Sequence, residues 1–256
     1  MLLGVLLCTG TSLTAQQERD APTAPPRFLR QPCPSPSSSD TPIGHGVAVC
    51  GSVVVPQQRR VGGRPLVPVV LSTAVYASVG AKGTPVLFLA GGPGESSIDA
   101  VDQVLLATPT GQVLRRDHPI IAFDRRGIAS PASDASPDLG QITVSLVGRR
   151  AAALNALADV LTRRAHALRA QGVEPSAFTT ASAVQDIVDV LHALHVDRVV
   201  LFGVSYGSHE ALRFMRLHPE MVEAAVLDGV APPTATHLLD SAYVAGVGRQ
   251  IVSRIV

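Results

Sequence analysis

The chain has 256 residues and a formal net charge of +1, with 21 Lys and Arg residues against 20 Asp and Glu residues. This balance argues against nucleic acid or an anionic membrane surface as a partner. Aromatic residues make up only 4% of the chain and tryptophan is absent, so the core must consist of Val, Leu, Ile and Ala. Such residues are typical of a buried parallel sheet flanked by helices, and the length suffices for a full domain core.

Residues 1–15 have the pattern of a signal peptide. An apolar run of seven residues is followed by small and polar residues, although the usual basic start is absent. The run is too short to span a bilayer. We therefore expect an exported protein, secreted or periplasmic, without a stable membrane span. Cys33 and Cys50 would then lie in an oxidising compartment, where we expect a disulfide between them; two unrelated thiols are the alternative.

Residues 16–46 are rich in Pro, Ser and Thr and cannot pack a core, so they are expected to form an extended arm. An α/β core with six strands is expected over residues 47–230. Its first two strands, at 47–56 and 66–77, flank a turn-rich segment and could pair in antiparallel fashion at the sheet edge.

The rest of this core alternates between strands and helices. Short apolar runs predict buried strands at 85–90, 119–123, 198–202 and 224–227. Helices are predicted at 98–107, 151–171 and 181–194, the last with Thr180 as its N-cap. The helix at 151–171 places these apolar residues on one face: Leu154, Leu157, Leu161, Ala165 and Leu168. The alternation predicts a mostly parallel sheet with right-handed crossovers and helices on both faces.

Gly203-Val204-Ser205-Tyr206-Gly207 lies between the strand at 198–202 and a segment with helical spacing at 208–216. A Gly-x-Ser-x-Gly sequence at a strand-to-helix switch is the nucleophile elbow of α/β-hydrolases. The strained turn lifts the serine hydroxyl clear of the sheet, and the flanking backbones approach too closely for a Cβ. Ser205 is therefore the predicted nucleophile, the alternative being an ordinary turn serine.

Four sequence blocks, in this order, resemble the α/β-hydrolases of the proline iminopeptidase and tripeptidyl aminopeptidase group. Residues 90–94, Ala-Gly-Gly-Pro-Gly, resemble its His-Gly-Gly-Pro-Gly loop, and residues 124–127, Asp-Arg-Arg-Gly, resemble its Asp-Gln-Arg-Gly turn. The elbow and residues 218–229 complete the set. The resemblance extends from about Cys50 to Pro233 and implies an α/β-hydrolase fold with serine peptidase activity.

The chain departs from the pattern of that group at three places. Ala90 replaces the usual histidine, and Arg125 stands where glutamine is usual. The glycine expected after Ile128 is missing, so that loop is one residue short. None of these differences removes the nucleophile.

Acyl transfer through a serine also needs two backbone N–H donors for the tetrahedral oxyanion. The amide that follows the nucleophile, on Tyr206, is one of them. The resemblance implies that Gly92 carries the other, with Gly91 leaving the backbone room to turn. The alternative is that residues 91–94 merely form a tight strand-to-helix connection.

The acid and the base of a catalytic triad are harder to find. In this fold the order is Ser, then Asp or Glu, then His, and the last two follow later strands. Asp228, at the end of the strand at 224–227, is the candidate acid. His237 is expected in a lid helix, and His218 at a helix end. We therefore expect the N-terminal part of a larger enzyme, in which residues 231–256 begin a cap domain and the last two strands of the sheet are absent.

These features predict a serine hydrolase that acts on a peptide or ester substrate. The resemblance favours an exported aminopeptidase; a carboxylic-ester hydrolase and a catalytically inactive remnant are the alternatives. No cofactor and no metal are assigned, since His209-Glu210 begins like a zinc-protease helix but Arg213 occupies the place of the second histidine. An aminopeptidase must also bind a free α-amine, which the group does with carboxylates of the cap.

Overall fold

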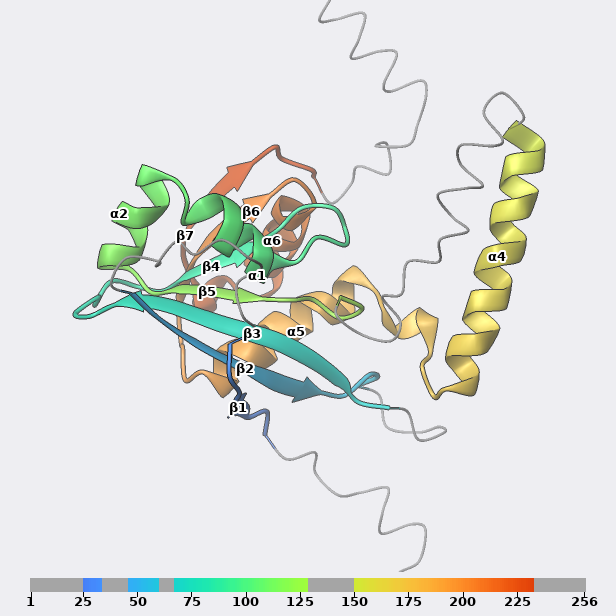
Figure 1. Cartoon of the computed structure of the whole chain (residues 1–256), viewed down its shortest axis with the longest axis horizontal. Coiled ribbons are helices and arrows are strands. Elements are labelled where there is room, and N and C mark those ends of the chain that lie inside the picture. The colour runs from blue at the N-terminus through green and yellow to red at the C-terminus, as the bar shows by residue number, and fades with distance from the viewer. Residues whose placement is uncertain (1–24, 34–45, 60–66, 129–149, 233–256) are drawn as a thin grey trace, which may run out of the picture.

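The computed structural model describes residues 25–33, 46–59, 67–128 and 150–232. Its strands form one sheet in the order β1-β2-β3-β5-β4-β6-β7 (Figure 1). The strands are β1 (Phe28–Arg30), β2 (Gly46–Val55), β3 (Val69–Ser78), β4 (Val86–Leu89), β5 (Ile120–Phe123), β6 (Val199–Val204) and β7 (Val222–Asp228). β5, β4, β6 and β7 run parallel, whereas β1, β2 and β3 join them through antiparallel pairs. The sheet is thus the mixed, largely parallel one that the alternation predicts.

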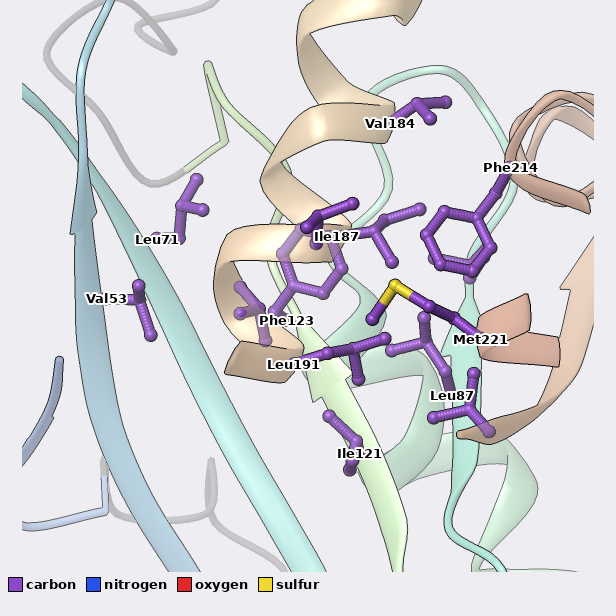
Figure 2. Packing of buried hydrophobic residues seen from close by; sticks show 14 of the residues in the cluster. Val53, Leu71, Leu87, Ile121, Phe123, Val184, Ile187, Leu191, Phe214 and Met221 are labelled. Carbon is purple, nitrogen blue, oxygen red and sulfur yellow. The ribbon is translucent and has the colours of Figure 1, made fainter. Parts of the chain in front are cut away.

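Helices pack on both faces of the sheet. Residues of α5 (Thr180–Ala193) and α6 (Tyr206–Leu217) share one hydrophobic cluster with the strands (Figure 2). Residues of the short α1 (Ser97–Ala100) and the π-helical η1 (Val101–Leu105) share a second cluster, against which α2 (Pro109–Asp117) also packs. Within β4, Leu87 and Leu89 belong to the first cluster and Phe88 to the second, because successive strand side chains point to opposite faces.

Six strands fall within residues 47–230 or overlap their start, as predicted, but the edge of the sheet and the N-cap of one helix differ from the prediction. The pair β2–β3 is antiparallel, but β1, from the expected arm, lies outside it at the edge. The N-cap of α5 is Thr179, whose extended backbone lets its hydroxyl accept a 3.2 Å hydrogen bond from the Ser182 N–H. Thr180 is already helical, and its hydroxyl lies 2.9 Å from the Tyr206 hydroxyl.

The predicted helix at 151–171 forms as α4 (Arg150–Ala170), but its apolar face does not pack on the sheet. Figure 1 shows α4 standing beside the body of the domain. Leu161 is 51% exposed, and Leu157, Ala165 and Leu168 are only half-buried. Helical periodicity therefore identified the helix correctly, while the described residues cover the face that it marked only in part.

Cys33 and Cys50 form a disulfide, as predicted. Within the described part of the chain, no helix has the length and apolar character needed to cross a membrane. The predicted signal peptide at 1–15 lies outside the described residues. So do His237 and all but the first two residues of the expected cap segment, 231–256.

Candidate active site

The candidate site lies at the edge of the sheet where the four parallel strands end. Because β5, β4, β6 and β7 run parallel, their carboxyl ends and the loops that follow them meet there. β5, which follows β4 in the sequence, pairs with one edge of β4, and β6 pairs with the opposite edge. The order of the strands therefore reverses at β4. Ligands of open α/β sheets bind at such a switch point.

Ser205 has the strained backbone that a nucleophile elbow requires. It follows β6 and precedes α6 with φ 52° and ψ −116°, and it is exposed. Its N–H donates to the Asp228 carbonyl at 2.8 Å, and its own carbonyl accepts from the Ser208 N–H at 3.0 Å and the Ser208 hydroxyl at 2.5 Å. These bonds hold the turn in a conformation that a non-glycine residue avoids on its own.

The two glycines of the elbow are required by close backbone approaches. A Cβ on Gly203 would lie 2.7 Å from the Gly207 carbonyl oxygen, and one on Gly207 would overlap the Leu89 carbonyl oxygen. Both approaches are closer than a carbon and an oxygen tolerate without bonding. Gly203 is therefore required where β6 meets the start of α6, and Gly207 where α6 packs against the end of β4.

The glycine-rich loop after β4 lies beside the serine. A Cβ on Gly91 would lie 3.3 Å from Ser205 Cβ, which is tighter than an ordinary contact between two such atoms. Gly92 has φ +101°, and its N–H has no acceptor among the residues that the structure describes. Tyr206 is the first residue of α6, where the N–H has no intrahelical acceptor. The two N–H groups predicted to bind the oxyanion thus belong to the segments that directly follow the neighbouring strands β4 and β6.

The turn after β5 braces this loop on one side. The Asp124 carboxylate accepts a 2.8 Å hydrogen bond from the Ser96 hydroxyl and a 3.4 Å bond from the Ile98 N–H. Burial raises the pKa of Asp124, and these hydrogen bonds partly offset the rise. Ser96 in turn caps α1 through the Asp99 N–H at 3.0 Å, so Asp124 fixes the exit of the glycine-rich loop.

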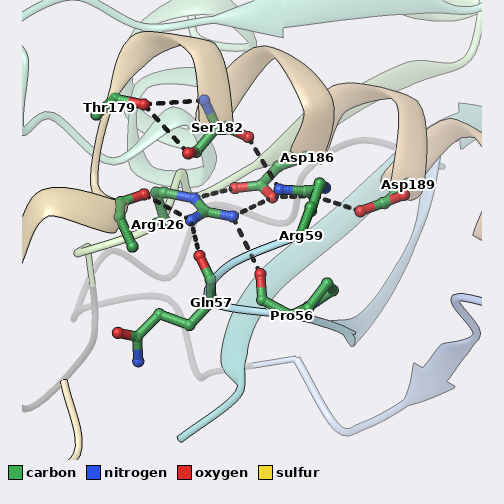
Figure 3. A network of polar contacts seen from close by, with 9 residues as sticks. Pro56, Gln57, Arg59, Arg126, Thr179, Ser182, Asp186 and Asp189 are labelled. Atoms are coloured by element: carbon green, nitrogen blue, oxygen red, sulfur yellow. Dashed lines mark hydrogen bonds and ion pairs between the residues drawn. The ribbon is translucent and has the colours of Figure 1, made fainter. Parts of the chain in front are cut away.

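Arg126, two residues further on, belongs to a buried ion-pair network. Its guanidinium donates to both oxygens of Asp186 at 2.6 and 2.7 Å and to the carbonyls of Gln57 at 3.0 Å and Ala177 at 2.8 Å (Figure 3). Arg59 reaches the same carboxylate at 2.7 Å. The network ties the chain after β2 to α5 and to the turn after β5. Sequence reasoning missed it because its members lie far apart along the chain.

Arg125 extends in the other direction, toward the elbow. Its guanidinium donates to the Gly91 carbonyl at 3.0 Å and to the Ala90 carbonyl at 2.6 Å, and lies 3.2 Å from a carboxylate oxygen of Glu210. Burial raises the pKa of Glu210 to about 7, although the Arg125 charge opposes that rise. Sequence reasoning noted Arg125 as a departure from the family pattern but gave Glu210 no role.

The structure brings the backbone of the candidate acid, Asp228, into contact with the serine. Asp228 ends β7 and accepts the Ser205 N–H through its backbone, while its exposed side chain has no partner among the described residues. No described histidine hydrogen-bonds the Ser205 hydroxyl. His218 ends α6 as expected, with its ring 5.3 Å from that of Phe214. The described residues also contain no group of His, Cys, Asp and Glu side chains that could hold a metal.

The sequence profile of the α/β hydrolase fold family matches residues 84–250. This range covers both glycine-containing loops, the elbow and every parallel strand described above. The chain therefore belongs to the α/β-hydrolase fold family.

Individual relatives are more distant. The chain is 29% identical over 198 residues to the serine protease Hip1 of Mycobacterium tuberculosis, an alignment that covers 74% of this chain and 37% of Hip1. Among solved structures, a proline iminopeptidase-related protein from Thermus thermophilus is 23% identical with a TM-score of 0.38, over 66% of this chain and 44% of that one. An epoxide hydrolase from Vigna radiata is 20% identical with a TM-score of 0.37, over 62% and 34%.

Proposed function

We propose that this protein is a serine hydrolase in which Ser205 is the nucleophile. The observation that carries the proposal is the exposed serine at φ 52°, placed at the switch point of the sheet and against the loop that carries Gly92. A turn serine without a catalytic role has no need of this strain, which persists only where the surrounding structure enforces it. The similarity to the serine protease Hip1 supports the same reaction class.

In this mechanism the Ser205 oxygen attacks the carbonyl carbon of the substrate while its proton passes to a histidine base. The carbonyl oxygen becomes an oxyanion that accepts hydrogen bonds from the N–H groups of Gly92 and Tyr206. The protonated histidine then gives its proton to the leaving group, which departs and leaves an acyl-serine. Water attacks the acyl-serine in a second round and restores Ser205. Asp228 is our candidate for the acid that orients the histidine, and the histidine is not among the described residues.

Within this class we propose an exported aminopeptidase that releases one or a few N-terminal residues. The resemblance of residues 90–94 and 124–127 to the proline iminopeptidase group supports the activity. The Cys33–Cys50 disulfide supports the export, because disulfides persist in oxidising compartments. The chain spans 37% of the length of the curated relative Hip1, so the activity of the whole protein is part of this proposal.

The position of Glu95 also favours a substrate with a positive charge near the scissile bond. One Glu95 carboxylate oxygen lies 2.9 Å from the place that a Cβ on Gly91 would take, and Ser205 Cβ lies 3.3 Å from the same place. An exposed carboxylate so close to the nucleophile would attract the α-ammonium group of a peptide. An uncharged ester gains nothing from it.

The proposal is tested on the protein produced from its complete reading frame. A fluorophosphonate probe followed by peptide mass spectrometry should label Ser205, and Ser205→Ala should abolish both labelling and hydrolysis. Alanine p-nitroanilide, its N-acetylated form and p-nitrophenyl butyrate then separate the alternatives. Preference for the free amine supports an aminopeptidase, and turnover of the butyrate alone indicates an ester hydrolase. A folded protein that is neither labelled nor active would be the inactive remnant and would overturn the proposal.

A further inference from the structure

Arg125 is a buried cation that contacts both the glycine-rich loop after β4 and the side chain of Tyr206. Its side chain is 8% exposed, and that of its partner Glu210 is 3% exposed. The guanidinium contacts the loop of Gly92 on one side and lies 5.2 Å from the ring centroid of Tyr206 on the other. We infer that Arg125 is a positioning residue, which orients and polarises the peptide group that carries the Gly92 N–H, and that Glu210 holds Arg125 in place. This inference rests on the proposed hydrolase function.

The geometry of the peptide group explains how Arg125 acts on a donor that it does not touch. The Gly91 carbonyl and the Gly92 N–H belong to one planar peptide group, which is trans. In a trans peptide these two bonds point in opposite directions. A donor fixed on the Gly91 oxygen at 3.0 Å therefore sets the plane of the group and directs the N–H away from the guanidinium, toward the open side of the loop.

The charge of Arg125 adds a second effect. Hydrogen bonds with a charged donor are roughly twice as strong as neutral ones, and a hydrogen bond to one end of an amide strengthens the donor at its other end. The Gly92 N–H thus becomes a stronger hydrogen-bond donor to an oxyanion than it would be without the Arg125 guanidinium. The Ala90 carbonyl, at 2.6 Å from the same guanidinium, fixes the preceding peptide as well.

Glu210 supplies the opposite charge from the nucleophile helix. It lies on α6, which begins directly after Ser205, so the ion pair connects the glycine-rich loop to the elbow. Asp186 on α5 is the other charged group that acts on Glu210, and it raises the Glu210 pKa. Asp186 is itself paired with Arg126 and Arg59. The second Glu210 oxygen is buried without a hydrogen-bond partner among the described residues, so Arg125 is its one ion-pair partner there.

The test compares Arg125→Gln with Arg116→Gln in the full-length protein. Arg116 is an exposed arginine paired with Asp117, so its variant controls for the loss of one positive charge. Arg125→Gln should lower kcat by about tenfold, less than the loss of an entire oxyanion donor, while KM changes by less than about twofold. The affinity for a boronic acid that forms a tetrahedral adduct with Ser205 should fall by the same factor as kcat. The control should leave all three values unchanged.

A second variant, Arg125→Lys, and the reaction of the wild-type protein with the fluorophosphonate probe complete the test. If Arg125→Gln does not fold, Arg125→Lys keeps the charge but loses the two-pronged geometry, and its kcat should also fall at constant KM. If the wild-type protein reacts with the fluorophosphonate probe and a folded Arg125 variant has an unchanged kcat, the positioning role of Arg125 is overturned. A wild-type protein that does not react with the probe would overturn the proposed function, and this inference with it.

Discussion

The Ser205 N–H donates a 2.8 Å hydrogen bond to the carbonyl oxygen of Asp228, which joins the nucleophile elbow to the end of the neighbouring strand. β6 and β7 are parallel partners whose register ends with Val204 beside Asp228. The hydrogen bond therefore continues the β6–β7 ladder by one step into the elbow. The sheet itself therefore holds Ser205 at its positive φ. The conformational cost of that φ can be measured by comparing the stability of variants at this position.

Replacing Ser205 by glycine should stabilise the protein relative to replacement by alanine. Alanine keeps the conformational cost of φ 52°, whereas glycine adopts that region readily. A non-glycine residue in a sparsely populated region costs about 1–3 kcal/mol, so Ser205→Gly should unfold at a higher urea concentration than Ser205→Ala. Equal midpoints would mean that the elbow is not strained in solution. Neither variant should hydrolyse substrate, because both lack the hydroxyl.

Gly207→Ala should destabilise the protein strongly. Its Cβ would overlap the Leu89 carbonyl oxygen, so α6 would have to move away from β4. Overpacking of this kind costs about 1–3 kcal/mol and sometimes more. Gly80→Ala is the control for a glycine in open space, because nothing lies within 4 Å of the added Cβ and its only cost is a positive φ that Gly207 does not have. Thermal unfolding should show a clearly larger loss for Gly207→Ala, and a similar loss in both variants would contradict the close approach.

Asp186→Asn should cost more stability than almost any other single polar substitution in this domain. Asp186 is fully buried, and its two oxygens receive Arg126 and Arg59. Removing one partner of a buried ion pair costs about 3–5 kcal/mol because the other charge is left buried. Urea unfolding measures this loss. Asp117→Asn, in an exposed pair with Arg116, is the control and should leave the urea midpoint nearly unchanged, because water screens such a pair. A small effect of Asp186→Asn would show that water enters the network.

The sequence was sufficient for the parts of the fold that depend on local pattern. Buried apolar runs located β4, β5 and β6 to within two residues at each end, and the spacing of glycine and serine located the elbow. The helix α2 was missed because its sequence is polar and contains Gly111, which is needed where a Cβ would overlap the Leu105 carbonyl oxygen. Such an approach between separate helices leaves no periodic signal in the sequence.

The long-range polar contacts could not be predicted for a related reason. Nothing near Arg125 in the sequence indicates Glu210 as its partner, because the contact exists only once β5 and α6 are placed around β4. The N-cap of α5 was missed by one position, since Thr179 and Thr180 are chemically equivalent and only the backbone angles distinguish them. Pattern reasoning thus located the strained serine of the elbow, and the tertiary fold had to supply the groups that brace it.

The burial of Glu210 should make the stability of the protein depend on pH near neutrality. Burial raises the pKa of Glu210 to about 7 in the folded protein, from an ordinary value of 4.5. Between these values the folded state holds a proton that the unfolded state has lost, so the contribution of Glu210 to stability is fully present below pH 4.5 and is lost as the pH rises through 7. Urea unfolding at about pH 5 and about pH 8.5 should therefore show that the stability of the wild type relative to Glu210→Gln falls with rising pH. Glu223→Gln is the control, because this exposed side chain accepts a hydrogen bond from the Thr84 hydroxyl and faces no histidine in any described contact. It should show no such trend relative to the wild type. A stability difference between the wild type and Glu210→Gln that stays constant with pH would mean that Arg125 keeps Glu210 ionised throughout this range.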